Sequence, residues 1–168
     1  PKLVERFTPE ACRTPETLAR ALALFDERYA AHKADKTAPY PGIAQLLQHL
    51  QAAGVRYGVV TNKDHAAAVG VLQHYFGSLV PHVQGRIDAL PPKPAPDTTH
   101  LLMKTLGAAP ETTLFVGDSN VDIATAKAAG LASCGVLWGF RTLGELQQAG
   151  ADHIAETPAA LQALILGQ

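Results

Sequence analysis

The sequence is short of the residues that mark disulfide scaffolds and histidine metal sites. Its 168 residues hold two cysteines, Cys12 and Cys134, far apart and in no spacing typical of metal binding. Seven histidines are scattered without an HxH or HExxH pattern. These absences exclude a disulfide-rich scaffold and argue against a histidine-built metal site. One disulfide between the two cysteines stays open, although we expect two reduced thiols in a cytoplasmic protein.

Neither sign of charge prevails, and no apolar run is long. The 14 Lys and Arg residues face 15 Asp and Glu residues, for a formal net charge of −1. Without a basic patch, neither nucleic acid nor a membrane surface is expected as a partner. The apolar runs are too short and too interrupted to span a bilayer. The composition, 47% hydrophobic and 17% charged, is that of a globular chain long enough for one core.

Most of the chain alternates between short apolar strands and helices. After a helix over 42–54, we expect strands at 55–60, 79–85, 112–117, 132–138 and 152–155, and helices at 64–76, 97–107, 121–130, 142–150 and 158–166. Because strands alternate with helices, they form parallel βαβ units. Their continuous apolar character suits a sheet covered on both faces. The sequence therefore predicts a three-layer, doubly wound, Rossmann-like α/β domain.

The first part of the chain lacks this alternation. Thr14 can cap a helix over 14–34, and the segment TAPYPG ends it, because two prolines and a glycine break helices. We therefore expect residues 1–38 to form a separate helical element and residues 39–168 to form the α/β core.

Five polar side chains stand near the ends of predicted strands. Thr61 and Asn62 follow the first strand, and Lys93 lies in the proline-rich loop PPKPAPD. Asp118 and Asp122 lie four residues apart, where another strand passes into a helix. Ligands of open parallel sheets bind at the carboxyl ends of the strands. We therefore expect these five side chains to lie at one edge of the sheet.

Each of these residues also has a plainer interpretation. Thr61 and Asn62, after the first strand, are residue types that often cap helices. Lys93 alone reads as a solvated surface lysine, although its four proline neighbours hold the loop stiff and extended. Asp118 is a candidate cap for the following helix, with Ser119 and Asn120 as rivals.

Taken together, the five side chains favour phosphate chemistry. Carboxylates are hard oxygen ligands that suit Mg²⁺, which commonly shares a phosphate. A hydroxyl, an amide and the backbone N–H groups at a helix start suit phosphate oxygens. A fixed lysine can neutralise the charge of a transferring phosphoryl group. The sequence therefore predicts half of a phosphoryl-transfer site, with Mg²⁺ as its cofactor and a small phosphorylated metabolite as its partner.

Three segments resemble motifs of the haloacid dehalogenase (HAD) superfamily. The stretches VVTNK, PPKPAPD and FVGDSNVDIATAKAAG are similar, in that order, to its motifs II, III and IV. The passages PYPGIAQLLQHLQAAGVRYGVVTNK and GVLWGFRTLGELQQAGADHIAETPAALQALI resemble its phosphoglycolate phosphatase-like members. The resemblance covers roughly residues 39–166, and residues 1–38 look like the remnant of an α-helical cap.

The resemblance implies catalytic and phosphate-binding roles for three residues. Thr61, as the motif II hydroxyl, would hold a phosphoryl oxygen with help from Asn62. Lys93 would bridge the phosphoryl group and the nucleophile.

The same resemblance implies a metal site at motif IV. Asp118 would ligate Mg²⁺ directly, and Asp122 would support the metal through water or steady the lysine of motif III. Ser119 is a further candidate beside the metal. Arg141, in the loop WGFR, is a candidate for contact with the substrate.

One motif of the superfamily is missing. In these 168 residues no aspartate is followed by another two positions later, so the apolar strand ending in DxDxT is absent. In the superfamily the first of those aspartates attacks phosphorus, and the second is a general acid and base. Their strand lies in the middle of the sheet, and its loss would leave two half-sheets with open edges. We therefore expect this sequence, which begins at Pro1, to be the C-terminal part of a longer phosphatase.

The expected function is Mg²⁺-dependent hydrolysis of a small phosphomonoester through an aspartyl phosphate. By resemblance, phosphoglycolate is the best guess for the substrate. A sugar-phosphate mutase is one alternative, because it shares these motifs and differs mainly in the cap. A non-catalytic fragment that binds Mg²⁺ or a phosphorylated ligand is the other. Without the nucleophile, the chain as printed is expected to turn over little substrate alone.

Overall fold

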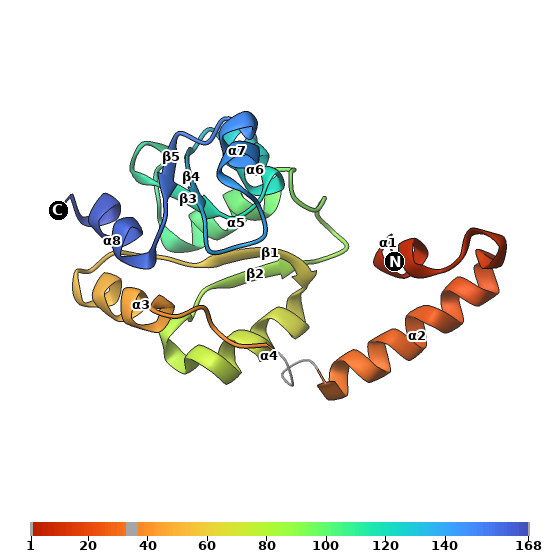
Figure 1. Ribbon diagram of the computed structural model, residues 1–168. Helices are drawn as coiled ribbons and strands as arrows, with labels where there is room; N and C mark the ends of the chain where they lie inside the picture. The colour runs from red at the N-terminus through yellow and green to blue at the C-terminus, as the bar shows by residue number, and fades with distance from the viewer. Residues whose placement is uncertain (1, 33–36, 168) are drawn as a thin grey trace. The chain divides into compact units, whose positions relative to one another are not determined.

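A computed structural model of the protein describes residues 2–32 and 37–167 (Figure 1). The chain divides into two units, Pro1–Ala38 and Pro39–Gln168. In the described ranges, no helix is both long enough and apolar enough to cross a membrane.

The first unit is helical. Its elements are α1 (Lys2–Phe7), the 3₁₀ helix η1 (Glu10–Cys12) and α2 (Pro15–His32). The hydroxyl of Thr14 accepts a hydrogen bond from the N–H of Thr17 at 3.2 Å, so it caps α2 as predicted. The ring of Phe25 lies 6.4 Å from that of Phe7 and 5.6 Å from that of Tyr29, centroid to centroid. This aromatic cluster packs α1 against α2. Residues 33 and 34 of the predicted helix lie outside the described ranges.

The second unit contains five strands and six α-helices among its described residues. The strands are β1 (Val59–Asp64), β2 (Val83–Arg86), β3 (Leu114–Gly117), β4 (Ala132–Val136) and β5 (His153–Ala155). The α-helices are α3 (Ile43–Ala52), α4 (His65–Phe76), α5 (Asp97–Leu106), α6 (Asn120–Ala128), α7 (Leu143–Ala149) and α8 (Pro158–Leu166), with 3₁₀ turns η2 (Gly77–Leu79) and η3 (Pro110–Thr112). The predicted α/β alternation is therefore present.

All strand pairs are parallel, but they form two sheets. One sheet is β1–β2, and the other has the order β3–β4–β5. Within the described part of the chain, β1 and β3 each pair with a strand along one edge only. The N–H of Val59 donates to the carbonyl of His82 beside β2 at 2.9 Å, so the backbone groups of Val60 point to the open edge of β1. The expected loss of a central strand stays a prediction.

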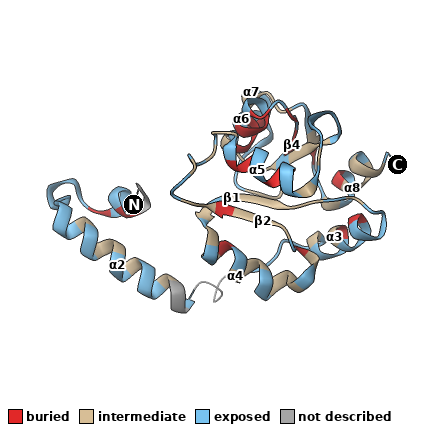
Figure 2. Ribbon diagram, turned by 180° about the vertical axis from the view of Figure 1, so that it is seen from behind, coloured by how far each residue is buried: buried red, intermediate tan, exposed pale blue. Residues whose placement is uncertain are grey.

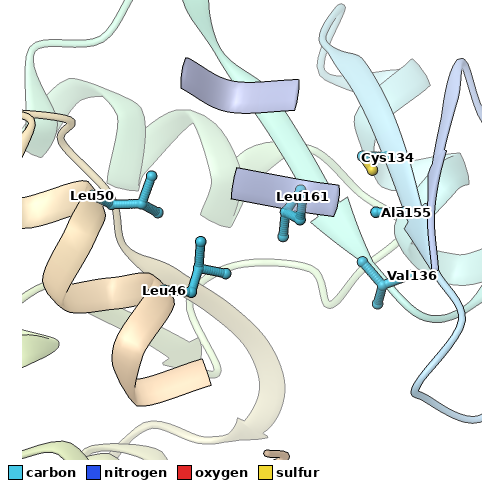
Figure 3. Packing of buried hydrophobic residues seen from close by; sticks show 6 residues of the cluster. All are labelled: Leu46, Leu50, Cys134, Val136, Ala155 and Leu161. Carbon is cyan, nitrogen blue, oxygen red and sulfur yellow. The ribbon is translucent and has the colours of Figure 1, made fainter. Parts of the chain in front are cut away.

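Two hydrophobic clusters hold the helices against the strands. The first joins α3, β4, β5 and α8 (Figure 3) through Leu46, Leu50, Cys134, Val136, Ala155 and Leu161. The second is formed by Met103 of α5, Ala126 of α6, and Ala129 and Leu131 just after α6, with Phe115 of β3 packed against it. Figure 2 shows buried residues gathered in α6 and β4. Helices thus cover the three-stranded sheet on both faces, as a three-layer α/β fold requires.

The strand β1 begins and ends later than the predicted 55–60. The N–H of Val55 donates to the carbonyl of Leu50 and closes the end of α3 at 2.9 Å. The hydroxyl of Tyr57 donates to the carbonyl of Leu79 at 2.7 Å. These contacts use residues 55–58 as a connection, and pairing with β2 starts at Val59. As a result, Thr61 and Asn62 lie within the strand and not after it.

Candidate active site

Lys93 is held between the open edge of β1 and the start of α6. Its Nζ lies 2.6 Å from Oδ1 of Asp122 and donates to the carbonyl oxygen of Val60 at 3.2 Å. The ring centroid of Phe115 lies 5.7 Å from the same Nζ, within range of a cation–π contact. The side chains of Lys93 and Asp122 are only 12% and 10% exposed. Lys93 is therefore a fixed cation, and its interpretation as a solvated surface lysine is wrong.

The side chain of Asn62 holds the backbone of Lys93 on both sides. Its Oδ1 accepts a hydrogen bond from the N–H of Lys93 at 2.8 Å, and its Nδ2 donates to the carbonyl of Lys93 at 3.0 Å. The amide group thus ties β1 to a loop 31 residues further along the chain. Asn62 is expected from the sequence to assist phosphate binding, and that role stays a prediction. The geometry adds a second role, which is to position the lysine.

Asp122 is fixed on its other oxygen by Ser119. Its Oδ2 accepts hydrogen bonds from the Ser119 hydroxyl at 2.6 Å and from the Ser119 N–H at 3.2 Å. Ser119, and not Asp118 or Asn120, is the N-cap of α6 and forms a capping box with Asp122. A Cβ at Gly117 would lie 2.2 Å from the Cβ of Asp122, so only glycine leaves room for this side chain.

Asp118 is half-buried at the end of β3 and meets the loop that follows β4. Its Oδ2 accepts a hydrogen bond from the N–H of Phe140 at 3.0 Å. Gly139 passes directly beneath the carboxylate, since a Cβ there would lie 2.2 Å from the Cβ of Asp118. Oδ1 of Asp118 accepts no hydrogen bond from the residues that the structure describes. One oxygen of this carboxylate is therefore held by the protein, and the other is available.

Thr61 and Arg141 lie at the margins of this arrangement. The Thr61 hydroxyl accepts a hydrogen bond from the N–H of Lys63 at 3.1 Å. Arg141 pairs with Glu145 at 3.3 Å and lines a polar hollow of about 390 Å³. Asn120, at the start of α6, borders the same hollow. Substrate contact by Arg141 stays a prediction.

Backbone groups that the sequence does not indicate hold two of the predicted side chains. The carbonyl of Val60 and the N–H of Phe140 contact two of the five predicted residues directly. Gly117 and Gly139 make room for the two aspartates. The signal in the sequence was a glycine at each point where a carboxylate approaches the backbone.

Cys134 does not replace the missing nucleophile. Its side chain is fully buried in the first hydrophobic cluster. Burial raises the pKa of its thiol, so the thiolate that would attack phosphorus is disfavoured at neutral pH. Cys134 and the exposed Cys12 are both free thiols.

The donor set has room for a magnesium ion but does not enclose one. Among the described residues, no group of three His, Cys, Asp or Glu side chains gathers around one point. Mg²⁺ usually takes one or two carboxylates and fills its octahedron with waters and substrate phosphate. The free Oδ1 of Asp118 fits that requirement. Both oxygens of Asp122 already accept hydrogen bonds, so of its two expected roles the geometry favours steadying Lys93.

Comparison with known proteins points to one family. A model of haloacid dehalogenase-like hydrolases matches residues 1–130. The phosphoglycolate phosphatase of Escherichia coli K12 is 38% identical over 122 residues, which are 70% of this chain and 47% of that protein. That of Salmonella typhi is 37% identical over the same length. The chain thus spans about half the length of the curated relatives it matches.

Solved structures agree with this family. The crystal structure of a candidate phosphoglycolate phosphatase from Lactobacillus delbrueckii subsp. bulgaricus superposes with a TM-score of 0.88 at 36% identity. The match covers 95% of this chain and 66% of that one. A predicted phosphoglycolate phosphatase from Haemophilus somnus gives a TM-score of 0.82 at 29% identity, over 92% of this chain and 68% of that one.

Proposed function

The chain belongs to the haloacid dehalogenase-like hydrolase family, and from this premise we propose that it carries most of the active site of a Mg²⁺-dependent phosphatase. The observation that supports this most strongly is the placement of Lys93. Its side chain is only 12% exposed, and its ammonium pairs with Asp122 and donates to Val60 at the open edge of β1. A buried cation at the edge of parallel strands is suited to the negative charge of a phosphoryl group.

The nucleophile in this proposal comes from a strand that lies between β1 and β3. Each of these strands has one edge without a partner strand in the described residues, and a buried open edge leaves backbone groups unsatisfied. The Lys93 ammonium satisfies the carbonyl of Val60 at that edge. A strand ending in DxDxT, encoded upstream, would pair with both edges and bring its aspartates beside Lys93 and Asp118.

The residues of this chain would then divide the work of phosphoryl transfer. The Thr61 hydroxyl donates to a phosphoryl oxygen, and Lys93 neutralises charge on the transferring group and on the attacking carboxylate. Asn62 and Asp122 hold the lysine at its backbone and at its ammonium. Attack by the upstream aspartate on phosphorus breaks the ester P–O bond, releases the alcohol and forms an aspartyl phosphate, which water then cleaves to inorganic phosphate and the free aspartate.

The cofactor in the proposal is Mg²⁺, held by Oδ1 of Asp118 together with the upstream nucleophile, substrate and water. When bound, the ion would withdraw electron density from the phosphoryl oxygens. The contribution of this chain is to present one oriented carboxylate oxygen at the end of β3.

The substrate in the proposal is a small phosphomonoester of the phosphoglycolate type. The likeness to phosphoglycolate phosphatases supports this choice. Among the residues that the structure describes, no contact favours the mutase alternative. Because the two thiols are free, we retain a reducing compartment, the cytoplasm, as part of the proposal.

The test compares two forms of the protein on a small set of substrates. The native polypeptide, with its length fixed by intact mass, and the 168-residue chain are each given phosphoglycolate, glucose 1-phosphate and glucose 6-phosphate with Mg²⁺. We expect phosphate release from phosphoglycolate by the native polypeptide and little or none by the 168-residue chain. Interconversion of the glucose phosphates would instead identify a mutase. Binding of phosphoglycolate by both forms without turnover would identify a non-catalytic protein.

A further inference from the structure

The Gly139–Phe140 segment lies against the carboxylate of Asp118. We infer that this segment is a positioning element, which fixes Oδ2 and leaves Oδ1 as the single oxygen that can bind a divalent cation. The inference rests on the proposed function, because it assigns a task to a loop beside the proposed metal ligand. Its first observation is the hydrogen bond from the N–H of Phe140 to Oδ2 at 3.0 Å.

The close fit of Gly139 is the second observation. A Cβ at this position would lie 2.2 Å from the Cβ of Asp118 and 2.3 Å from its Oδ2. The backbone of Gly139 is outside the left-handed region, so its conformation alone does not demand glycine. The requirement is one of space. A side chain here would push the carboxylate away from the amide that holds it.

The loop is anchored on both sides, which makes its amide a fixed donor. Before it, the N–H of Leu137 donates to the carbonyl of Ala155 at 3.1 Å, and Trp138 packs against the first hydrophobic cluster. After it, Thr142 and Glu145 form a capping box at the start of α7. By contrast the ring of Phe140 is 86% exposed and adds little to the packing of the loop. The backbone of residue 140 therefore accounts for its contact with Asp118.

A carboxylate with one oxygen held in this way favours binding a cation through the other oxygen alone. Mg²⁺ demands near-octahedral geometry, in which each ligand group places one oxygen atom close to the ion. Hydrogen bonds that orient metal-ligating carboxylates change metal affinity about 10–100-fold when they are lost. The segment would therefore determine the affinity for Mg²⁺ but not the rate of the chemical step.

The experiment compares Gly139→Ala with Gly144→Ala in the native polypeptide. Gly144 lies in α7, would have no neighbouring atom within 4 Å of an added Cβ and is not left-handed, so it is the matched control. Titration calorimetry with MgCl₂ alone gives the affinity for Mg²⁺, and phosphate release gives kcat against Mg²⁺ concentration. For Gly139→Ala we expect affinity about 10–100-fold weaker, with kcat restored at saturating Mg²⁺. Gly144→Ala should behave as wild type.

Each further outcome decides the inference. Unchanged Mg²⁺ affinity in folded Gly139→Ala overturns it, while loss of Mg²⁺ binding in Asp118→Asn would still uphold the proposed function. If Gly139→Ala does not fold, Phe140→Pro, which removes the N–H donor, carries the same expectation. Folding of either variant only at raised Mg²⁺ supports the inference. Failure of both to fold at any Mg²⁺ concentration overturns it, because the segment would then serve the fold alone.

Discussion

The ammonium of Lys93 and the carboxylate of Asp122 form an ion pair with an N–O distance of 2.6 Å, although the residues are 29 positions apart. Both side chains are about nine-tenths buried. The pair links the loop after β2 to the start of α6, and the same ammonium contacts β1. Lys93 thus connects β1 of one sheet to the helix α6 that follows β3 of the other, beside the proposed phosphate site.

Removing the lysine should reduce both activity and stability. Lys93→Ala removes the cation that faces the phosphoryl group, and we expect kcat to fall by about 10²–10³-fold. It also leaves the buried carboxylate of Asp122 without its partner, which should cost about 1–3 kcal/mol in the free energy of unfolding. Urea unfolding and steady-state kinetics measure the two effects. Lys104→Ala, at an exposed lysine on α5, should change neither.

The two effects can be separated by a second substitution. In Lys93→Ala/Asp122→Asn the buried negative charge is gone, so we expect part of the stability to return without activity. Full activity in Lys93→Ala would remove this residue from the proposed mechanism.

The hydroxyl of Thr61 should affect substrate binding more than folding. Thr61→Ala removes the proposed donor to a phosphoryl oxygen, and we expect KM to rise by about tenfold, the loss of one hydrogen bond. Thr61→Ser keeps the hydroxyl and should restore most of the affinity. Equal KM values for the alanine and serine variants would show that the hydroxyl does not contact the substrate.

The amide of Asn62 should matter through the lysine that it holds. Asn62→Ala deletes both hydrogen bonds to the Lys93 backbone, and a displaced lysine should lower kcat by up to about 10²-fold. If Asn62 contacts phosphate only, inorganic phosphate should bind more weakly while kcat stays near wild type. The measurement is kcat beside the inhibition constant of phosphate, and that second pattern would contradict the positioning role.

Asp152 should give the fold a weak acid dependence. Hydrogen bonds from the Ser133 hydroxyl at 2.6 Å and the Ser133 N–H at 2.8 Å lower the pKa of Asp152 below its usual value. Because the folded pKa is lower than the unfolded one, the carboxylate stabilises the fold above about pH 4. That contribution is lost as the pH falls through the folded pKa. It should be below about 1 kcal/mol, because the group is exposed and solvent screens it.

Urea midpoints between pH 3 and pH 6 test this dependence. The difference between wild type and Asp152→Asn should be constant above pH 5 and shrink below pH 4. A difference that grows on acidification would contradict the assigned direction.

The order of elements followed from the sequence because local signals agree with the fold. Thr14 caps α2, and the predicted helix 97–107 lies at α5, within one residue at its end. The position of β1 did not follow, because a strand begins where a partner pairs with it, and the partner of Val59 lies 24 residues later. Hydrophobicity at residues 55–58 did not indicate that the hydroxyl of Tyr57 would donate to Leu79 of η2 instead.

The site was predictable as residue types but not as contacts. The sequence alone shows carboxylates, a lysine and a hydroxyl near the ends of predicted strands. The clamp of Asn62 on Lys93 joins backbone and side chain across 31 positions, and no local pattern encodes it. Likewise the N–H of Phe140 meets Asp118 only because β3 and β4 pair in register, Gly117 opposite Gly135.

The most direct measurement is the release of inorganic phosphate from phosphoglycolate by the native polypeptide and its Asp118→Asn variant, over a range of Mg²⁺ concentrations. If Asp118 serves a magnesium-dependent phosphatase site, the native polypeptide will hydrolyse the substrate only with Mg²⁺. The variant will stay folded and lose that activity at every Mg²⁺ concentration tested. Hydrolysis by Asp118→Asn at the wild-type rate, with the same Mg²⁺ dependence, would contradict the assignment.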